Sequence, residues 1–77
     1  MAVTIYTTPS CVFCKMTKEF FKANNVQYQE LDVAADAKAR EAMIAKSGQF
    51  GVPVTDINGQ IVIGFDQARL KELLGIR

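Results

Sequence analysis

Two cysteines, Cys11 and Cys14, are the only cysteines of a 77-residue chain that has no histidine. The segment Val3–Thr7 before them is typical of a strand, and we expect a helix to begin near Val12. Unpaired backbone N–H groups and the positive end of the helix dipole meet at such a start, so this position favours a thiolate on Cys11. A thiolate is the nucleophile in thiol–disulfide exchange, and Cys14 lies one helical turn further on. The pair therefore predicts a redox centre.

The composition is that of a small globular protein. Hydrophobic residues make up 49% of the chain and charged residues 22%, which argues against disorder. The formal net charge of +1 gives no reason to expect a nucleic acid or an anionic membrane as partner. The apolar runs are too short for a membrane span, and the first residues do not resemble a signal peptide. We expect one domain over residues 1–77, a monomer in the cytoplasm, where cysteines stay mostly reduced.

The helix that follows the first cysteine is the first of several expected elements. Phe13, Met16 and Phe20 recur at helical spacing, and residues 24–25 (Asn-Asn) are expected to end the helix. Ser10 is the expected cap of its first turn. This helix would carry both cysteines at its start.

The remaining elements follow from apolar periodicity and turn residues. Asn-Gly at 58–59, between two apolar runs, predicts a hairpin because both central residues must adopt positive φ. The expected elements are a strand over 26–33, a helix between Asp36 and Ser47-Gly48, hairpin strands over 53–57 and 60–63, and a helix that Asp66 caps. The order β-α-β-α-β-β-α predicts an α/β fold with a four-stranded mixed sheet, in which the first strand lies between the second and the third and the fourth follows the third. The helices must cover this sheet for it to bury its apolar residues.

Three segments of the chain resemble the glutaredoxins of the thioredoxin superfamily. Residues 7–15, Thr-Thr-Pro-Ser-Cys-Val-Phe-Cys-Lys, are similar to the family's active-site segment. Gly51–Val54 is similar to its Thr-Val-Pro segment, and Gly64–Asp66 to the Gly-Gly-(Cys/Ser)-Asp segment that opens its last helix. The resemblance covers essentially the whole chain. It implies a thioredoxin-like fold with three helices flanking the four-stranded sheet.

The resemblance also implies a substrate-binding site. A cis peptide between Val52 and Pro53 would face the sulfurs, and the backbone of Val52 would pair with the substrate as a strand does. Gln49 and Asp66 match positions that contact glutathione in the family, and Phe13 is either a substrate contact or a packing residue. Beside the catalytic pair Cys11 and Cys14, the expected substrate-binding residues are Phe13, Gln49, Val52, Pro53, Gly64, Phe65 and Asp66.

Departures from the family pattern bear on the electron donor. Thr8 stands where glutathione-using members usually carry Lys, and Phe50 where Arg is frequent. Each lost contact between a cation and a carboxylate weakens binding by about 0–1 kcal/mol, so we expect weak glutathione binding. Residues 12–13 (Val-Phe) and 64–65 (Gly-Phe) also resemble the NrdH-type redoxins, which thioredoxin reductase reduces, although Asp66 departs from their Ser-Gly-Phe-Arg-Pro segment. Glutathione and thioredoxin reductase both remain candidate donors.

The expected activity is that of a dithiol thiol–disulfide oxidoreductase, which reduces protein disulfides or glutathione mixed disulfides without a bound cofactor. Cys11 would attack the substrate disulfide, and Cys14 would then attack the Cys11 sulfur. Backbone N–H groups of Phe13 and Cys14, or the Cys14 thiol, would hold the thiolate of Cys11 by hydrogen bonds.

Four other uses of the cysteine pair are weighed against this one. A structural disulfide would close a very short loop and stabilise little by loop entropy. A metal carrier could bind Cu(I) with two thiolates, but its fold needs strands where residues 36–47 predict a helix. An iron–sulfur cluster bridging two chains needs thiols beyond two copies of Cys11, and a zinc site within one chain is excluded by ligand count.

Overall fold

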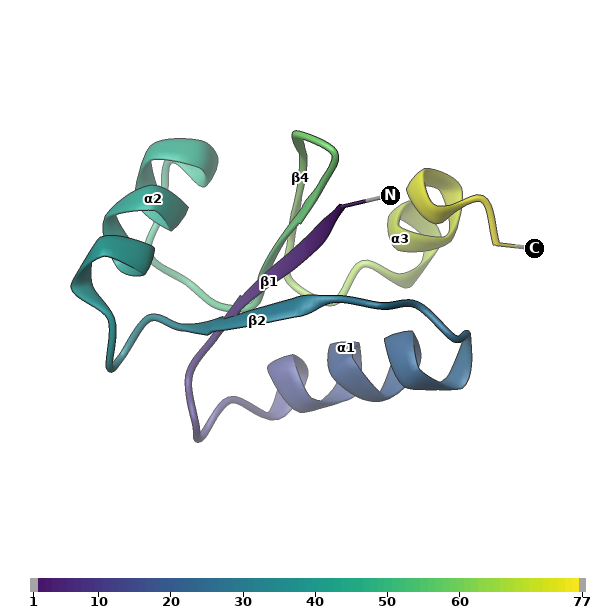
Figure 1. The fold of residues 1–77 in the computed structure, drawn as a ribbon, viewed down its shortest axis with the longest axis horizontal. Coiled ribbons are helices and arrows are strands. Elements are labelled where there is room, and N and C mark those ends of the chain that lie inside the picture. The colour runs from purple at the N-terminus through teal and green to yellow at the C-terminus, as the bar shows by residue number, and fades with distance from the viewer. Residues whose placement is uncertain (1, 77) are drawn as a thin grey trace.

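The computed structural model describes residues 2–76. The elements in chain order are β1 (Val3–Thr7), α1 (Val12–Ala23), β2 (Gln29–Asp32), α2 (Ala37–Ser47), β3 (Val54–Ile57), β4 (Gln60–Ile63) and α3 (Gln67–Leu74). This order confirms the predicted β-α-β-α-β-β-α succession (Figure 1). None of the helices within residues 2–76 has the length and apolar character needed to cross a membrane.

The strands form one mixed sheet in the order β2-β1-β3-β4. β1 pairs in parallel with β2, and the pairs β1–β3 and β3–β4 are antiparallel. The parallel pair arises because α1 connects β1 to β2, whereas the Asn58-Gly59 turn connects β3 directly to β4. Asn58 (φ 51°) and Gly59 (φ 90°) have the positive φ angles that the sequence predicts for this turn. The predicted sheet is therefore confirmed.

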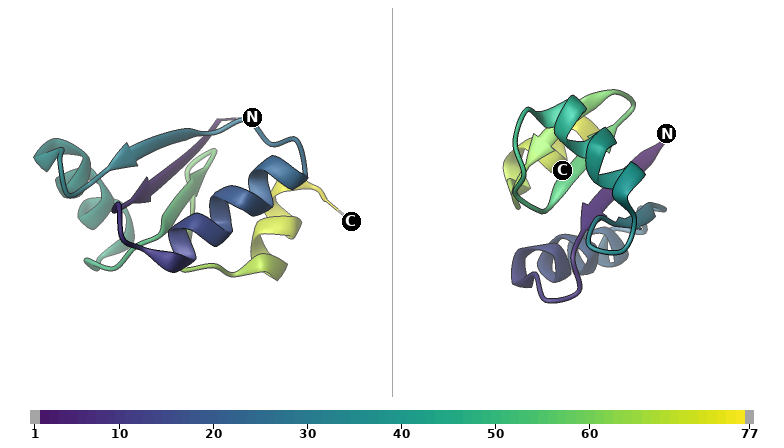
Figure 2. Two further views of the ribbon diagram at one scale, coloured as in Figure 1. Left: turned by 90° about the horizontal axis from the view of Figure 1, so that it is seen from below. Right: turned by 90° about the vertical axis from the view of Figure 1, so that its left-hand side faces the viewer.

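Two apolar clusters attach the helices to opposite faces of the sheet. Figure 2 (left) shows α1 and α3 side by side, with α2 at the other end of the molecule. Side chains alternate between the faces along each strand, so Ile5 and Tyr6 of β1 enter different clusters. The cluster beneath α1 and α3 comprises Val3, Ile5, Phe20, Phe21, Ile57, Val62 and Leu70. The cluster beneath α2 comprises Tyr6, Val33, Ala39, Met43 and Val54.

Strand β2 is shorter than the sequence predicts, since it spans Gln29–Asp32 rather than residues 26–33. The N–H of Val26 donates to the carbonyl of Phe21 at 2.8 Å, so this residue completes the end of α1 instead of entering the sheet. Val26 and Tyr28 then pack against the cluster beneath α1 and α3. The alternation of apolar and polar residues over 26–33 therefore reflects packing at the end of α1 as well as strand pairing.

A polar contact ties the end of α2 to the sheet. The Lys46 ammonium donates to the Asp56 carboxylate at 2.8 Å and to the Tyr6 hydroxyl at 2.9 Å. The hydrogen bond from Lys46 is the main cause that holds the pKa of the Asp56 carboxyl below its ordinary value. The pKa of Lys46 is raised in turn, mainly by Asp56 and then by Tyr6.

We expect this contact to make stability depend on pH in the acid range. Because the pKa of Asp56 is lower in the folded than in the unfolded chain, its contribution is complete above the ordinary value of 3.8 and is lost as the pH falls through the folded-state pKa. Asp56→Asn should therefore reduce the free energy of unfolding at pH 7, and the difference from the native chain should shrink below pH 3.8. Urea unfolding of both chains across this pH range measures the difference in the free energy of unfolding. A difference that does not change with pH would contradict the role given to the Asp56 carboxylate.

A second stability prediction concerns Thr55, which is fully buried in β3. Within residues 2–76 its hydroxyl has no hydrogen-bond partner, and such a group costs about 1–3 kcal/mol. We expect Thr55→Val, which keeps the shape of the side chain, to raise the free energy of unfolding by about 1 kcal/mol. Thr17→Val is the control, because the equally buried Thr17 donates to the Phe13 carbonyl at 2.8 Å. Urea unfolding that finds Thr55→Val no more stable than the native chain would refute this expectation.

Candidate active site

Cys11 caps helix α1 with its sulfur. Its backbone is extended (φ −87°, ψ 113°), and its Sγ accepts a hydrogen bond from the N–H of Cys14 at 3.0 Å. The sulfur thus occupies the place that a Ser or Asp oxygen takes at most helix starts. The prediction of Ser10 as the cap is wrong, because the helix begins one residue later than such a cap requires.

The two sulfurs form a disulfide, with 5.2 Å between the Cα atoms of Cys11 and Cys14. Cys14 is only 1% exposed, whereas Cys11 is partly exposed. This difference arises because Cys14 lies on the face of α1 that packs on the sheet, together with Thr17, Phe20 and Phe21. A molecule approaching from solvent meets the Cys11 sulfur first.

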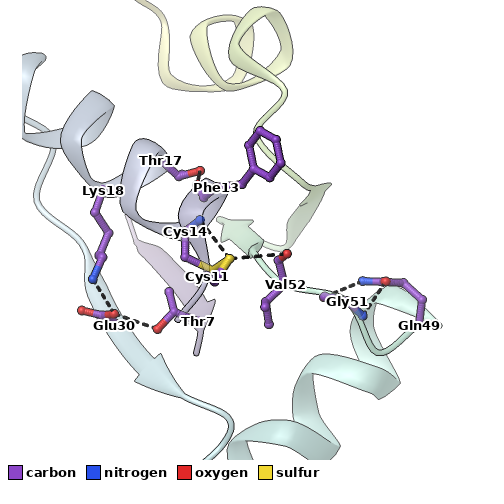
Figure 3. The surroundings of a disulfide bond; sticks show 10 residues. All are labelled: Thr7, Cys11, Phe13, Cys14, Thr17, Lys18, Glu30, Gln49, Gly51 and Val52. Carbon is purple, nitrogen blue, oxygen red and sulfur yellow. Dashed lines mark hydrogen bonds and ion pairs between the residues drawn. A yellow bond between two sulfur atoms is a disulfide. The ribbon is translucent and has the colours of Figure 1, made fainter. Parts of the chain in front are cut away.

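The loop before β3 lies against Cys11. The Val52 carbonyl oxygen is 3.8 Å from the Cys11 sulfur (Figure 3). The peptide between Val52 and Pro53 is cis, as the resemblance implies. Pro53 is buried and Val52 is half-buried. The cis peptide thus directs a backbone carbonyl at the exposed sulfur.

The segment that opens α3 is tied to the same loop. The Gly64 N–H donates to the Pro53 carbonyl at 2.8 Å. Phe65 turns inward and packs edge-on against Phe20, with 5.9 Å between ring centroids. Asp66 is exposed and caps α3 by accepting the Arg69 N–H at 3.2 Å. The structure therefore brings Gly64 next to the loop, gives Phe65 a packing contact, and confirms Asp66 as a cap.

Gln49 shapes the loop through its side chain. Its amide nitrogen donates to the Gly51 carbonyl at 3.0 Å, and its amide oxygen accepts the Gly51 N–H at 2.7 Å (Figure 3). A Cβ at position 51 would lie 2.8 Å from the Gln49 oxygen, so a larger residue there would displace the Gln49 side chain. Both polar ends of Gln49 are thus engaged by its own loop, although the sequence suggests a glutathione contact.

Exposed apolar side chains occur on the first turns of α1, in the loop before β3 and at the end of β4, and we call them the apolar rim. Phe13 is 59% exposed and Phe50 79%. They lie within two residues of Cys11 and Val52, respectively. Ile63 is 55% exposed and pairs with Val54, the residue after Pro53. The members of the rim are Val12, Phe13, Met16, Phe50 and Ile63.

The exposure of Phe13 and Met16 differs from what the apolar periodicity of α1 suggests. Phe13 and Met16 share a helical spacing with Phe20, but they are exposed. The helix is rotated so that Cys14 and Thr17 face the sheet. Sequence periodicity missed this because it counts apolar residues and treats the small buried Cys and Thr as neutral. The signal available in the sequence was the pair of apolar residues, Val12 and Phe13, directly after Cys11.

A polar groove of about 880 Å³ borders the disulfide on the side away from Val52. It includes Cys11 and Cys14 in its wall, between α1 and β2. The Thr7 hydroxyl donates to the Glu30 carboxylate at 2.7 Å, and Lys18 donates to the same oxygen at 2.9 Å (Figure 3). These two contacts, the one from Thr7 first, lower the pKa of the Glu30 carboxyl. Sequence reasoning missed Thr7 and Glu30, because only the register of β1 and β2 brings them together.

The structure offers few ligands for a metal. Within residues 2–76 no three side chains of His, Cys, Asp or Glu are grouped so that they could hold one. Residues Ala37–Ser47 form a helix, so the chain does not have the fold of the metal carriers considered above. A cluster shared between two chains remains an untested hypothesis.

A redox-active Cys-x-x-Cys at a helix start, beside a cis-proline loop and a mixed four-stranded sheet, defines a redox protein of the thioredoxin-like fold. The glutaredoxin family model matches residues 3–62, and the chain belongs to the glutaredoxin family. The chain is 44% identical over 72 residues to a glutaredoxin-like 8.6 kDa protein in the rubredoxin operon of Clostridium pasteurianum, covering 94% of this chain and 96% of that one. It is 38% identical over 64 residues to glutaredoxin 3 of Escherichia coli K12, covering 83% and 77%.

Solved structures support the same assignment. A mutant form of the thioredoxin-like protein BC3987 superposes with a TM-score of 0.93 at 39% identity, covering 97% of this chain and 96% of that one. The glutaredoxin-like NrdH-redoxin of Escherichia coli superposes with a TM-score of 0.85 at 27% identity, covering 95% of each chain.

The geometry predicts different outcomes for the two cysteines. Cys14→Ser should accumulate a mixed disulfide through Cys11, because the buried second sulfur is missing and cannot release the substrate. Cys11→Ser should abolish disulfide reduction. Mass spectrometry of the trapped adduct and an insulin-reduction assay measure these outcomes. Full activity of Cys11→Ser would overturn the assignment of the attacking sulfur.

Proposed function

We propose that this protein is a dithiol oxidoreductase that reduces disulfides in protein partners. The observation that carries the proposal is the Cys11 sulfur, which accepts the Cys14 N–H at 3.0 Å at the start of α1 and faces the Val52 carbonyl at 3.8 Å. The hydrogen bond from the Cys14 N–H stabilises a thiolate on Cys11, and the Val52 backbone lies where an incoming disulfide could pair with it. A reducing compartment such as the cytoplasm suits it, since the dithiol form must be maintained.

The energetics of the Cys11 thiolate support the proposal. Moving the pKa of a thiol from about 8.5 to about 6 needs roughly 3.4 kcal/mol. The helix start supplies about 0.3–1 kcal/mol, and up to about 2 in good geometry. A hydrogen bond from a backbone N–H to a charged sulfur supplies about 1.5–3 kcal/mol. The observed cap therefore supplies a stabilisation of the required size.

The reaction balances without a prosthetic group. The Cys11 thiolate attacks one substrate sulfur, the substrate disulfide breaks, and the leaving thiolate takes a proton from water. Cys14 then loses its proton and attacks the Cys11 sulfur, which releases the second substrate thiol. Two electrons pass to the substrate, and the protein ends as the Cys11–Cys14 disulfide. An external reductant must restore the dithiol.

The surroundings of Cys11 favour a protein over glutathione. Glutathione is a small anionic tripeptide, whereas Thr8 and Phe50 occupy positions at which the family carries cations. The Gln49 amide is bonded to its own loop. The apolar rim instead matches a partner with apolar residues next to its disulfide. Thioredoxin reductase is a donor of this kind, and the NrdH-redoxin of Escherichia coli, which this chain resembles, is described as having a thioredoxin-like activity profile.

The donor assay tests this choice. NADPH oxidation should be faster with thioredoxin reductase than with glutathione and glutathione reductase. Phe50→Ala should raise the KM for the reductase about tenfold, which corresponds to about 1.4 kcal/mol of lost apolar contact. Asp66→Ala is the control for the glutathione position, because it alters the residue that contacts glutathione in the family. It also removes the cap of α3, so thermal unfolding is measured alongside, and the folded variant should keep the reductase-fed rate. Faster reduction by glutathione, with no effect of Phe50→Ala, would reject a protein donor.

A further inference from the structure

The Gln49 side chain binds the loop that faces Cys11 in the way a neighbouring strand would. Its amide nitrogen donates to the Gly51 carbonyl at 3.0 Å, and its amide oxygen accepts the Gly51 N–H at 2.7 Å (Figure 3). Two residues that face each other in an antiparallel sheet exchange the same two hydrogen bonds. The amide of Gln49 therefore pairs with both backbone groups of Gly51.

Gln49 is itself anchored to the end of α2. Its N–H donates to the Ser47 hydroxyl oxygen at 3.4 Å, and that hydroxyl donates to the Met43 carbonyl at 2.7 Å. Met43 is only 1% exposed and belongs to the cluster beneath α2. A chain of hydrogen bonds thus runs from a buried residue of α2 through Gln49 to Gly51.

Glycine at position 51 leaves room for this contact. A Cβ there would lie 2.8 Å from the Gln49 amide oxygen, and Gly51 does not have the positive φ of Gly48 or Gly64. The backbone at position 51 would therefore accept alanine, whereas the Gln49 side chain would have to move away. Gly51 and Gln49 form one interlocked unit.

The next residue, Val52, presents its backbone to the site. Its carbonyl oxygen lies 3.8 Å from the Cys11 sulfur, and within residues 2–76 its N–H has no hydrogen-bond acceptor. A partner that binds a backbone already ordered loses less conformational entropy than one that must first order a loop. The contact between Gln49 and Gly51 therefore prepares Val52 for binding.

We propose that Gln49 is a positioning residue, which acts through Gly51 to fix the Val52 backbone for the peptide chain beside a partner's disulfide. This inference rests on the proposed function. The contacts of Gln49 are to Ser47 and Gly51 and not to a sulfur, so the exchange between sulfurs follows the course described above. Gln49 should therefore matter for disulfides within a protein and much less for small disulfides that have no backbone to pair.

Single-turnover reduction of two substrates by the dithiol protein tests the inference. Insulin supplies a disulfide within peptide chains, and bis(2-hydroxyethyl) disulfide supplies one without a peptide backbone. Gln49→Ala should lower the ratio of the two second-order rate constants, insulin over small disulfide, about fivefold, because the loop must then be ordered as the partner binds. The pH profile of Cys11 alkylation by iodoacetamide should stay that of the native chain.

A second variant and a control make the test specific. Gly51→Ala displaces the Gln49 amide and should lower the same ratio. Adding Gln49→Ala to Gly51→Ala should cause no further fall, because both changes remove one contact. Gln60→Ala makes the same chemical change at an exposed position of β4 and should leave the ratio at its native value. Thermal unfolding of each variant checks that the fold persists.

Three results would overturn the inference. Equal slowing with both substrates in Gln49→Ala would mean that Gln49 only supports the fold. An unchanged ratio, with a native chain that reduces both substrates, would reject the role of Gln49 and leave the proposed function standing. If the native chain reduces the small disulfide but not insulin, the proposed function fails and this inference fails with it.

Discussion

The hydrogen bond from the Cys14 N–H to the Cys11 sulfur is the contact on which the site depends. It requires Cys11 to keep an extended backbone directly before Val12, the first residue of α1, so that the sulfur replaces the usual oxygen cap. The same turn of helix places Cys14 against the sheet and leaves Cys11 partly exposed. One local interaction thereby gives two chemically identical residues different environments, which a two-step exchange reaction needs.

The rest of the fold holds a backbone against that sulfur. The Val52 carbonyl lies 3.8 Å from Cys11 because its loop is fixed at both ends. Gln49 closes the loop on Gly51 from one end, and the Gly64 N–H binds the Pro53 carbonyl at the other. The hairpin β3–β4 is thus more than an addition to the sheet, since its last residues support the loop that faces the cysteines.

Local signals in the sequence predict most of this fold. The Asn58-Gly59 turn, the Asp36 and Asp66 caps and the Cys-x-x-Cys position depend on residues close in the chain, and each is confirmed. The errors lie at the ends of the elements. Cys11 rather than Ser10 caps α1, and β2 begins at Gln29 because Val26 completes the end of α1.

The site itself was harder to predict than the fold. Phe13 and Met16 fit an apolar helical stripe, but the sheet selects which stripe is buried, and it selects the one with Cys14 and Thr17. The contact between Thr7 and Glu30 depends on the register of two parallel strands, which no local pattern specifies. Sequence reasoning therefore finds the reactive residues, while tertiary packing determines what surrounds them.

The two sides of the disulfide differ in the surfaces that border them. On the Cys11 side, apolar side chains and a free backbone edge can exclude water as a partner docks, which strengthens the hydrogen bonds around the sulfur. On the other side of the disulfide, charged residues of α1 and β2 line an open groove whose wall includes both cysteines. Cys11 therefore stands where an apolar surface and a charged groove meet, since its sulfur also lies 3.8 Å from the Val52 carbonyl oxygen.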